Sequence, residues 1–280
     1  MVCIQGGFKA KDVFDDVMPL CEANKSIIEQ VFPNPNQVMG KFVLHIFHGR
    51  IQETITTQLF SEKDGGYQDK FLRNLSSLYS RTKKVVKALE SFDLGTDSTF
   101  LEKITEQIYR KHLENYITIE IQCLQMKNNR ILAHYYDYLG HQKRVLQSSF
   151  QDIRRDIQAV IGTRANINIA QIENFGGETF LSEEVAINLL QESRMAYSRC
   201  KLLSKPKDVA INASQIFDLL TYSLLKEHVD YALELGLQAI PIPDQKTPPE
   251  IYFFDLVKSC NAIVHLYEKE FLDSLLPLIS

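Results

Sequence analysis

Apolar residues recur at three- and four-residue intervals along most of the chain, and this spacing predicts helices. The stretch over 98–138 contains neither proline nor glycine, and it starts with Thr99-x-x-Glu102, a pattern typical of a capping box. We therefore predict one long helix over 98–138. Its two apolar stripes require neighbours on two sides, and its polar face, which includes Lys127 and Asn128, is expected to contact water.

Proline, glycine and asparagine divide the rest of the chain into further helices. The predicted helices cover residues 11–31, 35–60, 67–92, 149–161, 182–203, 208–236 and 250–276. Pro19 should kink or split the first helix, and Asn34 should cap the second with Pro35 in its first turn. Residues 163–178 are predicted to form a long loop. The only alternating pattern typical of a strand is the short one at 167–169.

Short connections between consecutive helices predict antiparallel packing. The predicted fold class is all-α, an elongated rod of stacked antiparallel helical bundles. We place a first bundle at 1–95 and a second at 96–280, joined through the long helix at 98–138. The helix at 250–276 is apolar on most sides, so we expect it to be buried on more than one face.

Composition and charge narrow the possible partners and compartments. The 45% hydrophobic and 24% charged residues are normal for a chain that buries a core, and the formal net charge of −4 does not favour nucleic acid as a partner. Five widely spaced cysteines form no Cys-x-x-Cys pair, which indicates reduced thiols. Neither a signal peptide nor a run of about 18 apolar residues is present. We predict a cytoplasmic protein without a transmembrane segment.

Residue patterns that could support catalysis or bind a metal are incomplete. His45 and His48 are three residues apart, but no acidic partner completes a metal site. Asp15 and Asp16 resemble part of the aspartate-rich motif of all-α isoprenoid synthases, whose third aspartate is missing here. The chain has no phosphate-binding loop and no nucleophile elbow. We predict no enzyme, cofactor or metal. A magnesium-dependent enzyme using the two aspartates is kept as a minor alternative.

The candidate site residues are a run of basic residues in the third predicted helix: Arg81, Lys83, Lys84 and Lys87. A looser basic group lies within residues 143–155. Basic residues on a helix usually form a solvated face. The alternative hypothesis is that the run contacts an acidic protein or a lipid headgroup.

Several short stretches match one known family in the same order along the chain. They are FDLGTD at 92–97, LENYI at 113–117, YYD at 135–137, HQKR at 141–144, GETFLS at 177–182, NLLQE at 188–192, EHVDYALE at 227–234 and PLIS at 277–280. Together they resemble the exocyst component five family. Its members are non-enzymatic subunits of the octameric complex that tethers secretory vesicles to the plasma membrane.

The resemblance implies a segment of a tethering subunit, built from stacked helical bundles and acting in vesicle docking during exocytosis. Its partners would be other exocyst subunits and, through the complex, small GTPases or plasma-membrane phosphoinositides. Its place would be the cytoplasm, peripheral to the plasma membrane at exocytic sites. Family members are much longer, so we expect a central fragment. The alternative function is a lipid-headgroup-binding helical module that uses the run Arg81–Lys87.

Overall fold

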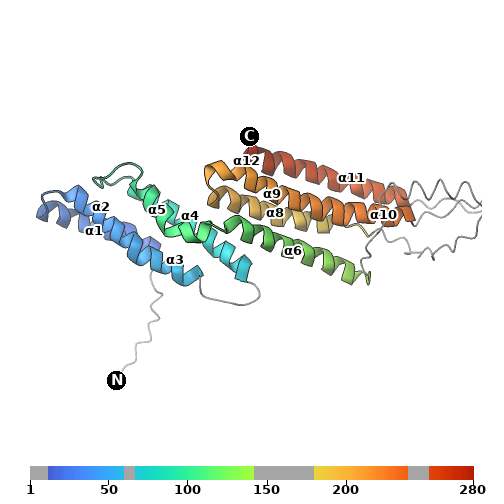
Figure 1. Ribbon diagram of the computed structural model, residues 1–280, viewed down its shortest axis with the longest axis horizontal. Coiled ribbons are helices and arrows are strands. Elements are labelled where there is room, and N and C mark those ends of the chain that lie inside the picture. The colour runs from blue at the N-terminus through green and yellow to red at the C-terminus, as the bar shows by residue number, and fades with distance from the viewer. Residues whose placement is uncertain (1–11, 60–66, 142–179, 239–251) are drawn as a thin grey trace, which may run out of the picture. The chain divides into compact units, whose positions relative to one another are not determined.

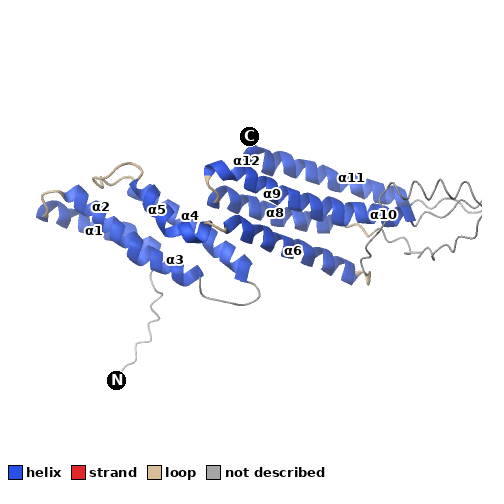
Figure 2. Ribbon diagram, viewed as in Figure 1, coloured by secondary structure: helices blue, strands red, loops and turns tan. Residues whose placement is uncertain are grey.

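The computed structural model describes residues 12–59, 67–141, 180–238 and 252–280, and within these ranges every regular element is a helix (Figures 1 and 2). The all-α prediction is therefore confirmed for the described residues. The helix predicted at 149–161, the loop at 163–178 and the basic group within 143–155 lie outside them. None of the described helices is both long enough and apolar enough to cross a lipid bilayer.

The chain divides into two compact units. Unit 1 comprises Met1–Cys123 and Ala196–Asn212, and unit 2 comprises Leu124–Met195 and Ala213–Ser280. The division differs from the predicted boundary at residue 95. The reason is that α5 (Phe100–Leu113) buries Leu101, Ile104 and Ile108 in the hydrophobic core of unit 1.

In its first segment, Met1–Cys123, the described part of unit 1 contains six complete helical elements. They are α1 (Val13–Val31), α2 (Pro35–Ile46), the π-helix η1 (Phe47–Ile51), α3 (Gln52–Leu59), α4 (Tyr67–Leu89) and α5. Asn34 is the N-cap residue of α2 and Pro35 opens that helix, as predicted. Helix α1 is not split at Pro19. Pro19 is exposed, so the backbone hydrogen bond that it removes lies on the water side of α1.

The turn between α4 and α5 packs closely against the start of α2. The Asn36 side chain donates a hydrogen bond to Asp93 Oδ2 at 2.6 Å. Gly95 adopts a φ of +60°, a conformation that favours glycine. A Cβ atom added at Gly40 would lie 2.5 Å from the carbonyl oxygen of Leu94. Both glycines are therefore required for this contact.

The predicted single helix over 98–138 is wrong, because the structure has two helices there. Helix α5 ends at Leu113, Glu114 and Asn115 form a turn, and α6 runs over Tyr116–Tyr138. Asparagine side chains compete for backbone hydrogen bonds and disfavour helix interiors. The break allows Tyr116, which is only 2% exposed, to enter the core of unit 1.

The predicted capping box at the start of this region is also wrong. Thr99 makes no side-chain capping bond to the helix. Its hydroxyl instead donates to Asp97 Oδ1 at 2.7 Å, and the same oxygen accepts the Thr99 backbone N–H at 2.9 Å. Asp97 therefore provides the local turn that precedes α5.

Three helices, α6, α8 (Glu183–Leu203) and α9 (Val209–Thr221), contribute residues to both units. A short 3₁₀ turn, Pro206–Asp208, precedes α9. The prediction that Ser182 caps α8 is confirmed, since its hydroxyl oxygen accepts the Val185 N–H at 3.3 Å.

Four-residue spacing describes the buried face of α6. The buried residues at this spacing are Tyr116, Glu120, Leu124, Asn128, Leu132 and Tyr136, and Cys123 is buried beside them. The prediction that Asn128 contacts water is therefore wrong, and its side chain donates to Ser223 Oγ at 3.0 Å. The prediction assumed that a polar side chain must face water. Here a buried hydrogen-bond partner compensates for the loss of water.

The remaining described elements of unit 2 are all helical. They are the π-helix η3 (Tyr222–Asp230), α10 (Tyr231–Gln238), α11 (Tyr252–Glu270), the π-helix η4 (Phe271–Leu275) and α12 (Leu276–Ile279). The predicted helix end at Gly236 is wrong by two residues. A Cβ atom there would overlap the Leu256 side chain of α11, so this glycine permits close helix packing instead of capping the helix.

The last helical segment is buried on one face, and the prediction of several buried faces is wrong. Leu256, Cys260 and Ile263 of α11 enter the core of unit 2. Phe254 is 70% exposed and Leu272 is 57% exposed. In the described part of unit 2, neighbouring helices thus cover only one side of this segment.

We predict that Gly40→Ala lowers the free energy of unfolding by about 1–3 kcal/mol, because the new methyl group meets backbone atoms that cannot move aside easily. Gly49→Ala is the control. No atom lies within 4 Å of the position of its Cβ, so this substitution should stabilise the chain by up to about 1 kcal/mol. Urea unfolding monitored by circular dichroism measures both effects. Equal effects of the two substitutions would contradict the proposed packing.

Candidate functional site

The predicted basic site lies on α4 in unit 1, but one of its four residues serves the fold. Arg81 forms an ion pair with Asp12, the N-cap residue of α1, and its guanidinium lies 4.4 Å from the centroid of the Phe14 ring. The hydrogen bond from Arg81 is the main cause that lowers the pKa of Asp12. Arg81 therefore links α4 to the start of α1.

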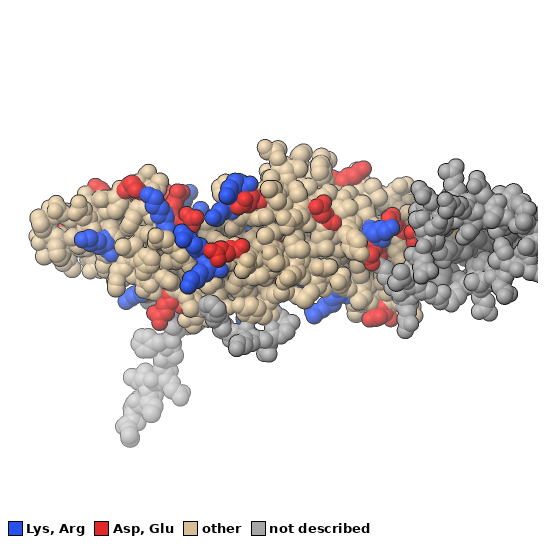
Figure 3. Space-filling view, in the orientation of Figure 1, with Lys and Arg blue, Asp and Glu red and all other residues tan. Residues whose placement is uncertain are grey.

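The other three basic residues of the group are exposed: Lys83, Lys84 and Lys87. The ammonium of Lys83 lies 5.7 Å from the centroid of the Tyr79 ring. Burial raises the pKa of Tyr79, and the nearby carboxylates of Glu106 and Glu102 raise it further. Acidic groups thus lie close to this side of α4. On the face drawn in Figure 3, basic and acidic side chains are likewise interspersed.

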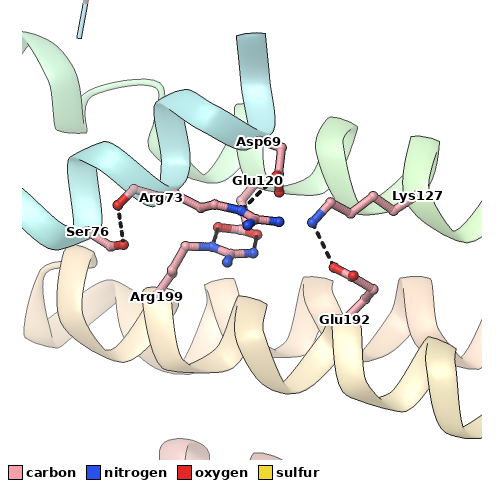
Figure 4. Close-up of polar contacts among 7 residues, drawn as sticks. All are labelled: Asp69, Arg73, Ser76, Glu120, Lys127, Glu192 and Arg199. Atoms are coloured by element: carbon pink, nitrogen blue, oxygen red, sulfur yellow. Dashed lines mark hydrogen bonds and ion pairs between the residues drawn. The ribbon is translucent and has the colours of Figure 1, made fainter. Parts of the chain in front are cut away.

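Unit 1 also contains a buried ion pair that we did not predict from the sequence. Arg199 of α8 donates from Nε to Glu120 Oε2 at 2.8 Å and from Nη2 to Glu120 Oε1 at 2.7 Å (Figure 4). Glu120 is fully buried, and Arg199 is 9% exposed. Burial opposes the charge of Arg199, but the hydrogen bonds and charge of Glu120 outweigh burial and raise the pKa of Arg199.

The energetic role of this pair follows from its burial. Two parallel charge-assisted hydrogen bonds compensate both groups for the loss of water. If one partner is removed, the other remains as an unpaired buried charge, and this costs far more than the pair contributes. Glu120 and Arg199 therefore hold α6 and α8 together as a matched set.

A second ion pair joins the same two helices within unit 2. Lys127 Nζ lies 2.8 Å from Glu192 Oε2, and each side chain is about one-fifth exposed (Figure 4). Moving seven residues forward along α6, from Glu120 to Lys127, corresponds to moving seven residues back along α8, from Arg199 to Glu192. The two pairs have opposite polarity: α6 supplies the acidic residue of the first pair and the basic residue of the second, and α8 supplies the reverse.

This reversal of polarity specifies the register of α6 against α8. A shift by seven residues in one direction would bring Glu120 opposite Glu192, and a shift in the other would bring Lys127 opposite Arg199. Each shift would create a like-charge contact and leave buried charges unpaired. Apolar packing alone would discriminate less well between these registers, because leucine-rich stripes tolerate shifts of seven residues.

A second buried polar cluster lies in unit 2 around His228, which is fully buried on η3. Its Nε2 accepts the backbone N–H of Ser182 at 3.1 Å, and its Nδ1 lies 3.2 Å from the Tyr136 hydroxyl. Nearby, His141 Nε2 lies 2.7 Å from the Tyr231 hydroxyl. These residues come from four of the stretches that carry the family resemblance, and they attach the start of α8 to η3.

The candidate metal ligands do not come together. Among the described residues, no three His, Cys, Asp or Glu side chains lie close enough to hold a metal ion. His48 Nδ1 lies 3.3 Å from Gln52 Oε1 on the same helical face. Asp15 and Asp16 occupy the first turn of α1, where the helix dipole favours carboxylates. Their positions therefore have a structural explanation.

Comparisons with known proteins point to one family. A family model described as exocyst complex component Sec10-like, alpha-helical bundle, matches residues 8–280. The chain is 44% identical to exocyst complex component 5 of Drosophila melanogaster over 98% of its own length and 38% of that protein. The corresponding values are 39%, 99% and 39% for the Homo sapiens protein, and 35%, 96% and 40% for the Caenorhabditis elegans protein. The chain thus spans between 38% and 40% of these relatives.

We predict that Arg199→Met lowers the free energy of unfolding by about 3–5 kcal/mol, because Glu120 remains buried and unpaired. The double variant Glu120→Leu, Arg199→Met should recover most of this loss. As a control, Lys103→Met breaks an ion pair with Asp97 in which both side chains are 63% exposed, so water screens the pair and the substitution should have little effect on the free energy of unfolding. Urea unfolding distinguishes the three variants. A double variant as unstable as Arg199→Met would refute the role of the unpaired charge.

Proposed function

The chain belongs to the Sec10-like family of exocyst components, and from this premise we propose that it is a helical-bundle segment of a subunit that tethers secretory vesicles. It acts in docking vesicles at the plasma membrane during exocytosis, and it does so without catalysis. The observation that carries the proposal is the family match over residues 8–280, together with the all-helical fold of the described residues.

The proposed mechanism is mechanical. A tether must keep its length while the two membranes move relative to each other. The continuous backbone hydrogen bonds of α6 and α8 resist bending. The ion pairs Glu120–Arg199 and Lys127–Glu192 resist sliding of one helix along the other, because sliding would separate buried charges. We extend this argument to a rod of stacked antiparallel bundles in the whole subunit.

The proposed partners are other exocyst subunits, with small GTPases and phosphoinositides reached through the complex. This places the protein in the cytoplasm, peripheral to the plasma membrane. The relatives support this assignment through their names as exocyst components. Contact between helical subunits needs complementary side faces and no reactive group.

A second proposal is direct binding of anionic lipid headgroups by α4. The observation in its favour is the exposure of Lys83, Lys84 and Lys87 on neighbouring turns of one helix. Arg81 contributes less than the sequence suggests, because Asp12 neutralises it. The nearby Glu106 weakens the site further, so we rank this function second.

We expect the tagged full-length protein that contains this segment to co-purify with other exocyst subunits and to restore secretion in cells that lack it. Arg199→Met should reduce secretion, whereas Glu120→Leu with Arg199→Met should retain it, because only the single variant leaves a buried charge unpaired. Secretion of a reporter protein provides the measurement. A well-folded full-length protein that co-purifies with no exocyst subunit would rule out the tethering function.

If α4 binds lipid, replacement of Lys83, Lys84 and Lys87 by Glu should weaken binding to vesicles containing phosphatidylinositol bisphosphate by at least about tenfold, since each basic residue contributes about 1 kcal/mol at a membrane surface. The matched control replaces three other exposed lysines, Lys41, Lys111 and Lys207, and changes the net charge equally. Vesicle co-sedimentation measures the affinity. Equal binding by the two triple variants would exclude α4 as the lipid site.

A further inference from the structure

We draw no further inference here: the strongest candidate, the groove of unit 2 between α9 and the helix formed by α11 and η4, which Phe217, Tyr267 and Phe271 line, carries none, because nothing in the structure shows what covers it.

Discussion

The buried ion pair between Glu120 and Arg199 constrains the structure more strongly than any single apolar contact. A carboxylate with no exposure is tolerated only while the guanidinium stays beside it. Helices α6 and α8 therefore cannot separate or slide without a large cost. Two apolar residues would hold the helices about as firmly, but they would not distinguish one register from the next. Together with Lys127–Glu192, the pair contributes specificity at least as much as stability.

The helices themselves could be predicted from the sequence, because apolar spacing reports which side of a helix is buried. The prediction failed where spacing continues through a break. Leu113 and Ile117 keep the four-residue interval across the turn at Glu114 and Asn115, and both are partly buried. The Glu114 N–H still bonds to the Arg110 carbonyl oxygen, and the Ile119 N–H bonds to the Asn115 carbonyl oxygen, so the helix is interrupted with the loss of few hydrogen bonds. The apolar pattern gives no sign of this interruption. The packing of Tyr116 in the core favours it instead.

Polar contacts were harder to predict than helices, since a charge does not reveal its partner. Arg81 belongs to an evident basic run, yet Asp12, far away in the sequence, neutralises it. Glu120 lies within the apolar stripe of α6, four residues from both Tyr116 and Leu124. This position in the sequence could have indicated that Glu120 is buried. The mixed charges beside α4 likewise depend on residues from separate helices.

The stretches that carry the family resemblance report mainly on the interior. Four of them meet at the cluster of Tyr136, His141, Ser182, His228 and Tyr231, where buried hydrogen bonds leave little freedom for substitution. A protein that acts by contact, however, works through its surface, where no motif is required. Family membership is therefore evident from residues that maintain the fold, whereas partner choice depends on the distribution of exposed charge and apolar area. The exposed lysines of α4 and the groove lined by Phe217, Tyr267 and Phe271 are surfaces of this kind, and no sequence motif marks either of them.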